Sequence, residues 1–199
     1  MPTLIDRAGP LQDRWSLFDP DTSGEPDAGK PLVMSVQQWS THGEALLACG
    51  AEVGICLEPA EGPEAIVHLL DRLGLVAVRF PAFTDGRGYS TARLLRQRYG
   101  WKGELRAVGD VLRDQIFYLG RCGFDTFELR DGEDVAAALA AFSDFTEAYQ
   151  EAADRGPLFR RRPQPSGSDD PSGALASDGA ITPSGALASS GAITTIAAR

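Results

Sequence analysis

Hydrophobic and polar positions follow two alternating patterns through the middle of the chain. Short runs with apolar residues at 53–57, 75–80, 104–108 and 125–129 are typical of strands, and the first two are nearly all apolar. Between them, apolar positions recur at the spacing of a helix face. Glycines end these helical stretches, where a left-handed cap conformation suits glycine; they are Gly50, Gly74, Gly100 and Gly123. The pattern therefore predicts a strand followed by a helix, several times over.

This repetition predicts an α/β fold with a parallel sheet of about four or five strands and right-handed crossovers. The sheet is either doubly wound or part of a β/α barrel, because both architectures use the same local unit. We expect this α/β domain at residues 31–155. Residues 1–30 are rich in Asp, Gly and Pro and predict an irregular segment, with one short edge strand at residues 15–18.

The last part of the chain differs in composition. A unit rich in Gly, Ser and Ala at residues 171–181 recurs nearly unchanged at residues 183–193. Two copies of such a unit do not bury a core. We therefore expect residues 156–199 to be a disordered, repeat-containing tail, and truncation after Arg162 to leave the melting temperature nearly unchanged.

Composition narrows the class of protein. The 199 residues suffice for one sizeable core, and no apolar run is long enough to span a bilayer. The N-terminus lacks the pattern of a signal peptide, so a cytoplasmic location is expected, without membrane association. Three scattered cysteines and two histidines predict no metal site, disulfide framework or evident cofactor. The net charge of −9 argues against non-specific nucleic-acid binding.

The charge is nevertheless uneven along the chain. Between Arg87 and Arg121 there are eight basic and three acidic residues. Such a strip predicts a surface for an anion or an acidic partner. Solvated helix faces in an arginine-rich chain are the alternative interpretation.

In a parallel α/β sheet, ligands bind at the carboxyl ends of the strands. Here those ends carry Glu58, residues 79–90, Gly109 with Asp110, and residues 128–131. The segment 84–90 contains two glycines, a carboxylate and a guanidinium, and it lacks both the dinucleotide fingerprint and the P-loop lysine. We therefore expect polar groups from distant parts of the sequence to meet at this edge.

The candidate catalytic residues are Asp85 and Asp110. Asp85 either takes part in catalysis or orders its loop by pairing with an arginine, and Asp110 is an acid or base or, as its position favours, a helix cap. The candidates for binding a ligand or partner are chosen for their place near helix starts, with Ser90 as a helix cap; they are Arg87, Ser90, Arg93 and Arg113.

Three long strings carry a resemblance to a known family. They lie at residues 80–96, 104–115 and 121–130, and they closely resemble the bacterial domain-of-unknown-function family 934 over roughly residues 30–150. The resemblance implies an oxidoreductase or an accessory protein of sulfite reduction. It brings no established catalytic residue with it.

The function that follows from the resemblance is an accessory protein or oxidoreductase of assimilatory sulfate or sulfite reduction, acting with sulfite reductase or its electron donor. The alternative from the residues is a small α/β enzyme or binding protein for an anionic metabolite at an arginine-rich rim. The sequence decides neither whether the protein is an enzyme nor its oligomeric state.

Overall fold

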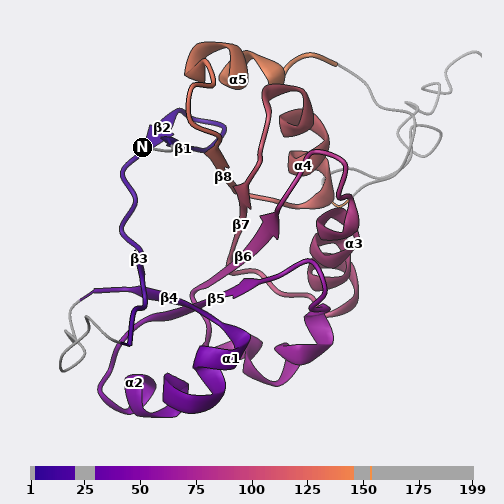
Figure 1. The fold of residues 1–199 in the computed structure, drawn as a ribbon. Helices are drawn as coiled ribbons and strands as arrows, with labels where there is room; N and C mark the ends of the chain where they lie inside the picture. The colour runs from indigo at the N-terminus through magenta and orange to yellow at the C-terminus, as the bar shows by residue number, and fades with distance from the viewer. Residues whose placement is uncertain (1–2, 21–29, 146–152, 154–199) are drawn as a thin grey trace, which may run out of the picture. The chain divides into compact units, whose positions relative to one another are not determined.

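The computed structural model describes residues 3–20, 30–145 and 153 (Figure 1). The chain divides into two units, Met1–Arg162 and Pro163–Arg199. The description below concerns the first unit. The tail expected at residues 156–199 lies outside the described residues.

The first unit contains one eight-stranded sheet in the order β2-β1-β8-β7-β6-β5-β4-β3. From β3 to β8 the strands are parallel and follow one another in sequence order, which confirms the parallel pairing expected for the four apolar runs. These strands are β3 (Ser16–Leu17), β4 (Leu32–Ser35), β5 (Val53–Leu57), β6 (Leu75–Phe80), β7 (Glu104–Gly109) and β8 (Thr126–Leu129). Sequential order with right-handed crossovers places every helix on the same side, so the sheet is a curled half-barrel and not doubly wound.

The sheet has more strands than the four or five expected. Three of them lie within the first 20 residues, where we expected an irregular segment. β1 (Thr3–Ile5) pairs antiparallel with β8, and β2 (Pro10–Leu11) pairs antiparallel with β1. Strands of two or three residues are too short to show a hydrophobic period, which is why the pattern missed them. Only the edge strand expected at residues 15–18 had a signal, and β3 lies there.

Helices connect the strands on the convex side. They are α1 (Val36–Gln38), η1 (Trp39–Gly43), α2 (Glu44–Ala48), η2 (Pro63–Ala65), η3 (Val67–Arg72), α3 (Arg87–Arg93), η4 (Leu94–Arg98), η5 (Arg113–Gln115), α4 (Ile116–Cys122) and α5 (Val135–Ala141). η1 and η4 are single π-helical segments, whereas η2, η3 and η5 are 3₁₀ helices. Among the described residues, no helix combines the length and the apolar character that crossing a membrane requires.

Two helix ends show how local sequence sets these boundaries. Ser35 caps α1 in a capping box with Gln38, as a serine before an apolar-periodic stretch predicts. Gly123 ends α4 with φ of 108°, a left-handed conformation that glycine adopts without strain. Phe124 then packs back into the core, and its amide donates to the Leu119 carbonyl at 3.2 Å.

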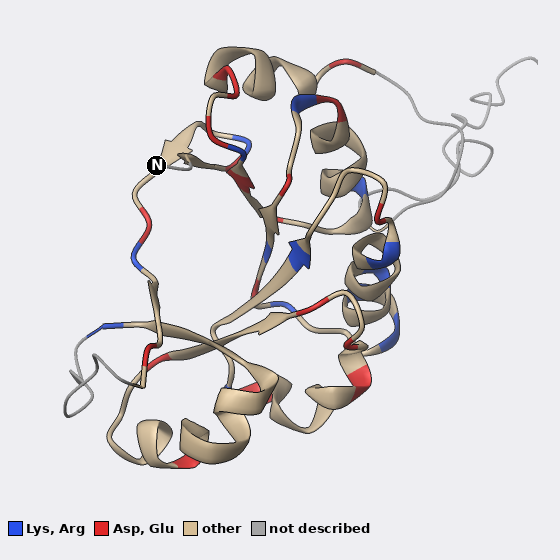
Figure 2. Cartoon of the chain, viewed as in Figure 1, with Lys and Arg blue, Asp and Glu red and all other residues tan. Residues whose placement is uncertain are grey.

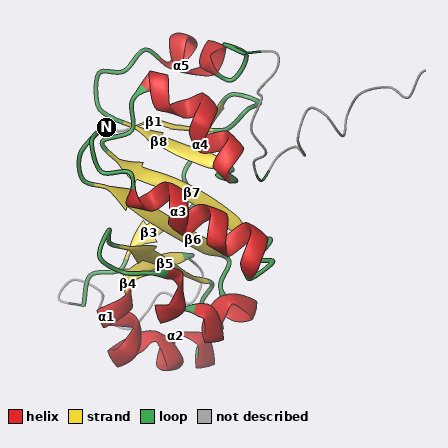
Figure 3. Cartoon of the chain, turned by 90° about the vertical axis from the view of Figure 1, so that its right-hand side faces the viewer, coloured by secondary structure: helices red, strands yellow, loops and turns green. Residues whose placement is uncertain are grey.

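The main core lies between the convex face of the sheet and the helices (Figure 3). Alternate strand residues such as Val76, Val78 and Phe80 point into it and meet helix residues such as Ala92 and Leu95. All five are at most 2% exposed. This layer accounts for most of the buried apolar surface of the described residues, and it holds the strands in their curved arrangement.

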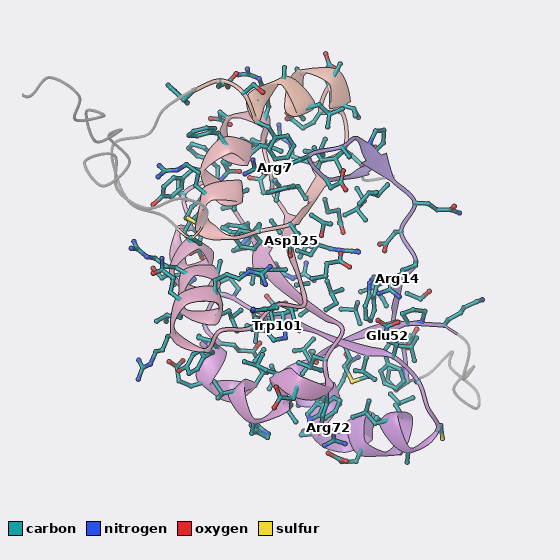
Figure 4. All side chains as sticks on the ribbon, turned by 180° about the vertical axis from the view of Figure 1, so that it is seen from behind. Arg7, Arg14, Glu52, Arg72, Trp101 and Asp125 are labelled. Carbon is teal, nitrogen blue, oxygen red and sulfur yellow. The ribbon has the colours of Figure 1, made fainter. Side chains whose placement is uncertain are left out.

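The segment between β2 and β3 crosses the opposite, concave side of the sheet (Figure 1). Trp15 packs there against Val33 and Leu75. Beside it, the Arg14 guanidinium donates two hydrogen bonds to the Glu52 carboxylate, at 2.8 and 2.9 Å, and the two side chains lie together in Figure 4. Residues 12–15 therefore form a strap that joins the two ends of the sheet.

Candidate functional site

A cavity of about 310 Å³ lies between the concave face of the sheet and the strap. Its floor is apolar and comes from small or branched side chains of adjacent strands, such as Leu75, Ala77 and Val108. Its polar lining is unusual for the inside of a sheet, because charged side chains from β6, β7, β8 and the strap face it together. Figure 2 shows basic colour on β6 and on β7 and acidic colour on the neighbouring β8, in the middle of the sheet.

Arg106 on β7 is the most buried of these charges, with 5% of its side chain exposed. Its guanidinium donates to Asp13 of the strap at 2.8 Å and to Glu104 at 2.9 and 3.2 Å. The Thr126 hydroxyl donates to the same Glu104 oxygen at 2.9 Å. Arg106 is therefore paired with two acids of the protein, and it ties the strap to the centre of the sheet.

Arg79 on β6 lies two residues after Ala77, on the same face of the sheet and closer to the carboxyl end of the strand. Its Nε donates to Glu58 at 2.8 Å, and 45% of its side chain is exposed. Its guanidinium also contacts the Cys56 thiol, and no hydrogen bond joins its two Nη groups to a carboxylate of a described residue. Arg79 can therefore present two charged donors to a molecule in the cavity.

Cys56 lies beside Arg79 in the wall of the cavity. Burial raises the pKa of the Cys56 thiol to about 11, although the charge of Arg79 works in the other direction. A thiol with such a pKa is almost entirely protonated at neutral pH and is a poor nucleophile. The arrangement therefore favours a packing role for Cys56.

Glu128 on β8 faces the cavity in the row of Val108 and Arg79, as the pairing of Ala107 with Phe127 and of Arg79 with Val108 places it. Its carboxylate makes no hydrogen bond or ion pair with any described residue. Burial raises the pKa of Glu128, and Asp13 and Asp131 add to this effect, whereas Arg106 and Arg79 oppose it. Glu128 is thus a half-buried carboxylate whose nearby arginines are already paired with other acids.

The strap contributes a further unsatisfied group. Trp15 is 7% exposed, and its indole Nε1 is buried without a hydrogen-bond acceptor among the described residues. Buried donors are nearly always paired in folded proteins, so this wall of the cavity lacks an acceptor. A cavity with free donors at Arg79, a free carboxylate at Glu128 and an apolar floor has the composition of a small-molecule site.

The segment 84–90, the main candidate from the sequence, forms a loop and the start of α3 on the rim. The Asp85 carboxylate accepts from the Arg87 amide at 3.2 Å and from its guanidinium at 2.6 and 3.0 Å. These hydrogen bonds lower the pKa of Asp85. The pair therefore orders the loop, as one of the two expected roles for Asp85 had it. Gly88 is required by packing, because a Cβ there would lie 2.6 Å from the Phe80 ring.

We had expected Asp110 and Ser90 to be helix caps, and this prediction is wrong. The chain stays extended at Leu112 and the next helix begins only at Arg113, so Asp110 lies too far upstream. Its carboxylate instead accepts from the Phe83 amide at 3.0 Å and from Arg130 at 3.3 Å. α3 begins at Arg87, which leaves Ser90 inside the helix.

The remaining candidates point away from the cavity. The Arg93 Nε donates to Gln97 on the same helix at 2.8 Å, and both line a shallow hollow with Ser90 and Arg98. Arg113 donates to the Ala137 carbonyl of α5 at 3.3 Å and to Asp144, which follows that helix, at 3.0 Å. The structure thus pairs Asp85 with Arg87 and connects Asp110 to the loop at Phe83 just before them. Arg93 and Arg113 have other hydrogen-bond partners and do not join these residues.

Sequence reasoning named the strand ends around Arg79 and Glu128 but did not select these two residues. It counted Arg106 only within the basic strip, and it missed Asp13. The available signal was a single charge inside an otherwise apolar strand, as in the run Leu105-Arg106-Ala107. Such a charge on a strand buried on both faces needs a buried partner or a ligand.

The described part of the chain contains no recognisable metal site. No group of three or more His, Cys, Asp or Glu side chains there is placed to hold an ion. The acids around Arg106 are used by its guanidinium, so they do not form a free oxygen cage.

Comparison with protein families gives one match. Residues 54–159 match the family described as bacterial protein of unknown function (DUF934), so the chain belongs to this family. The match covers β5 to β8 and therefore the strands that carry Arg79, Arg106 and Glu128. No curated protein matches the chain.

Proposed function

We propose that this member of the family binds a small metabolite with an anionic group in the concave cavity, and that Arg79 anchors that group. The observation that carries the proposal is the Arg79 guanidinium, which faces the cavity from the carboxyl end of β6 with its Nη groups free of carboxylates. In β/α barrels this end of the strands is where ligands bind. The cavity volume of about 310 Å³ suits a small metabolite.

We further propose that the protein serves assimilatory sulfate or sulfite reduction, as an oxidoreductase or as an accessory protein acting with sulfite reductase. The support for this setting is the family resemblance, and a small anionic ligand is compatible with it. Deletion of the gene, with growth tested on sulfate, sulfite, sulfide and cysteine, checks the setting. Growth on sulfide but not on sulfite would place the defect at sulfite reduction, whereas normal growth on all four would contradict this part of the proposal.

Complementation of the deletion strain then separates the cavity from the rim. Arg79→Met should fail to restore growth while its thermal melt stays close to that of the wild type. Arg87→Met is the matched control, because it removes the same charge from an exposed pair on the rim. Restoration by Arg79→Met and failure of Arg87→Met would move the ligand site from the cavity to the rim loop.

A second candidate function is docking of an acidic protein on α3 and η4. The observation that favours it is that Arg93 and Arg98 have no carboxylate partner among the described residues and line one hollow of about 400 Å³. Figure 2 shows several basic residues along this helix. Loss of co-purification with sulfite reductase on Arg93→Glu and Arg98→Glu, with cavity ligand binding intact, would support docking.

A further inference from the structure

The charges around the cavity do not suit a ligand that is only an anion. Four carboxylates line it or pair with residues that do, namely Asp13, Glu58, Glu104 and Glu128, against two guanidiniums, Arg79 and Arg106. Arg106 is shared by two of the acids, and Arg79 is paired with a third. With every group ionised the acids outnumber the bases, and Glu128 is the acid left over.

A carboxylate that is removed from water without a partner is costly, and proteins normally pair it. Glu128 is half-buried, lies in the wall of a cavity and has no partner among the described residues. A ligand that brings a positive charge to Glu128 would supply what the protein leaves out. Arg79 shows the opposite need, since its free Nη groups lack an anion.

The two groups face the same cavity from β6 and β8, with Val108 of β7 between them. Neighbouring strands are about 4.8 Å apart, so the backbones that carry Arg79 and Glu128 are separated by about 10 Å. Side chains on a strand stand roughly perpendicular to the sheet, so the charged ends of Arg79 and Glu128 do not pair directly, and a few bonded atoms of a ligand can lie between them. The apolar floor below them, with Ala77 at its centre, suits a short hydrocarbon part.

We propose that the ligand of the concave cavity is a small zwitterion, of the class of α-amino acids, whose carboxylate binds Arg79 and whose ammonium group binds Glu128. This inference rests on the proposed function for the Arg79 end and adds the Glu128 end. It makes Glu128 the residue that determines specificity, because it favours an ammonium group and repels a second anion.

Protonation of Glu128 gives the inference a second signature. A zwitterion needs Glu128 ionised, so its affinity falls as the pH falls through the raised pKa of that carboxyl. A plain anion would show the reverse, because the neutral acid repels it less. Between about pH 5 and 7 the two charges of an amino acid stay constant, so the protein group accounts for the change. The charged groups that face Glu128 are Arg79, Arg106, Asp13 and Asp131.

The experiment is calorimetric titration of the full chain with the twenty common L-amino acids, and with acetate and sulfate as plain anions. The amino acid that binds most tightly is then compared with two analogues of the same skeleton, one without the amino group and one without the carboxylate. Each analogue should bind at least about tenfold more weakly, the loss expected for one charged hydrogen bond. These comparisons use the unaltered protein, so they do not depend on a variant that folds.

Variants then assign each loss to a residue. Glu128→Gln should weaken the amino acid by about tenfold and leave the deaminated analogue unchanged or tighter, since the two changes remove the same contact. Glu44→Gln is the control, because it removes an equal charge from α2, where Glu44 forms an exposed ion pair with Arg72 of η3.

The outcomes of the titrations distinguish the zwitterion from the anion site at Arg79. If acetate, sulfate or the deaminated analogue binds as tightly as the amino acid, the zwitterion is wrong and the anion site at Arg79 stands. If the decarboxylated amine binds as tightly, or if no probe binds, both the anion site and the inference fail.

Discussion

The two faces of the same sheet differ in what they bury. On the convex face, Val76, Val78 and Phe80 of β6 are at most 2% exposed and belong to the main hydrophobic core. On the concave face, alternate residues of the same strand are Ala77 and Arg79, and they line a cavity. A strand can therefore contribute to stability on one side and to a site on the other, because successive side chains point to opposite faces.

The concave face is not the solution that stability alone would favour. Burying Arg106 beside Asp13 and Glu104 removes its charge, and the two carboxylates in part, from water, and a well-packed apolar set of similar volume is often as stable or more so. The sheet keeps these charges and leaves Glu128 without a partner in the described structure. Such placement is typical of functional sites, where stability gives way to chemistry.

The largest effect on stability should come from the convex face. Phe80→Ala should lower the free energy of unfolding by about 3–5 kcal/mol, because it leaves a cavity where the ring meets Tyr89 and Phe124. Urea unfolding followed by circular dichroism measures it. Phe83→Ala is the matched control, since that ring is 50% exposed and should cost much less. Equal losses for the two variants would contradict the assignment of the core.

A smaller loss should follow from the buried charge on the concave face. Arg106→Met should cost about 2 kcal/mol, because Asp13 and Glu104 lose their partner while both stay partly hydrated. The strap should also loosen, which hydrogen exchange of the Trp15 amide would report. Arg113→Met, an exposed arginine paired with Asp144, is the control. If Arg106→Met is as stable as the wild type, the strap is held by Trp15 and Arg14 instead.

The sequence predicted the parallel strands β5 to β8 because each carries apolar residues over four to six positions and follows within a few residues of a glycine that ends a helical pattern. It did not predict β1, whose pairing with β8 joins residues more than 100 positions apart in sequence, or β2, which pairs with β1. Their two or three residues have no period of their own, and the sheet edge that they cover supplies the missing information. Sequence order of the strands, which separates a half-barrel from a doubly wound sheet, is likewise a long-range property.

The site was predictable only as a region. The argument from strand ends reached Arg79 and Glu128, yet the loop at Asp85 and Arg87 attracted attention because its glycines and charges are adjacent in sequence. Adjacent opposite charges satisfy each other, as the Asp85–Arg87 pair does. The paired charges Asp13 and Arg106 of the cavity are 93 residues apart, so only the fold brings them together.

Glu128→Gln should change how the stability of the fold depends on pH, through a carboxyl on the concave face. A carboxyl whose pKa is higher in the folded than in the unfolded chain destabilises the fold once the pH rises above the ordinary value of 4.5. The glutamine variant lacks this loss, so it should be more stable than the wild type near neutral pH and equal to it at acid pH. Thermal melts across this range measure the difference. A variant that is less stable than the wild type at neutral pH would mean that the Glu128 carboxylate has a stabilising partner.

The smallest effect is expected at the rim. Arg87→Ala should leave the melting temperature within experimental error near neutral pH, because 61% of the Arg87 side chain is exposed and surface ion pairs contribute little. The lowered pKa of Asp85 means that whatever stability the pair gives is present above the ordinary pKa of that carboxyl and is lost as the pH falls through its folded value. Melts at neutral and acid pH, for the variant and the wild type, should therefore converge in acid. A clear loss at neutral pH would show that the Asp85–Arg87 pair holds α3 against the sheet, where Gly88 meets Phe80. The rim loop would then belong with the convex face and its stability, and the cavity would be the part of the described structure in which charges are kept for a ligand.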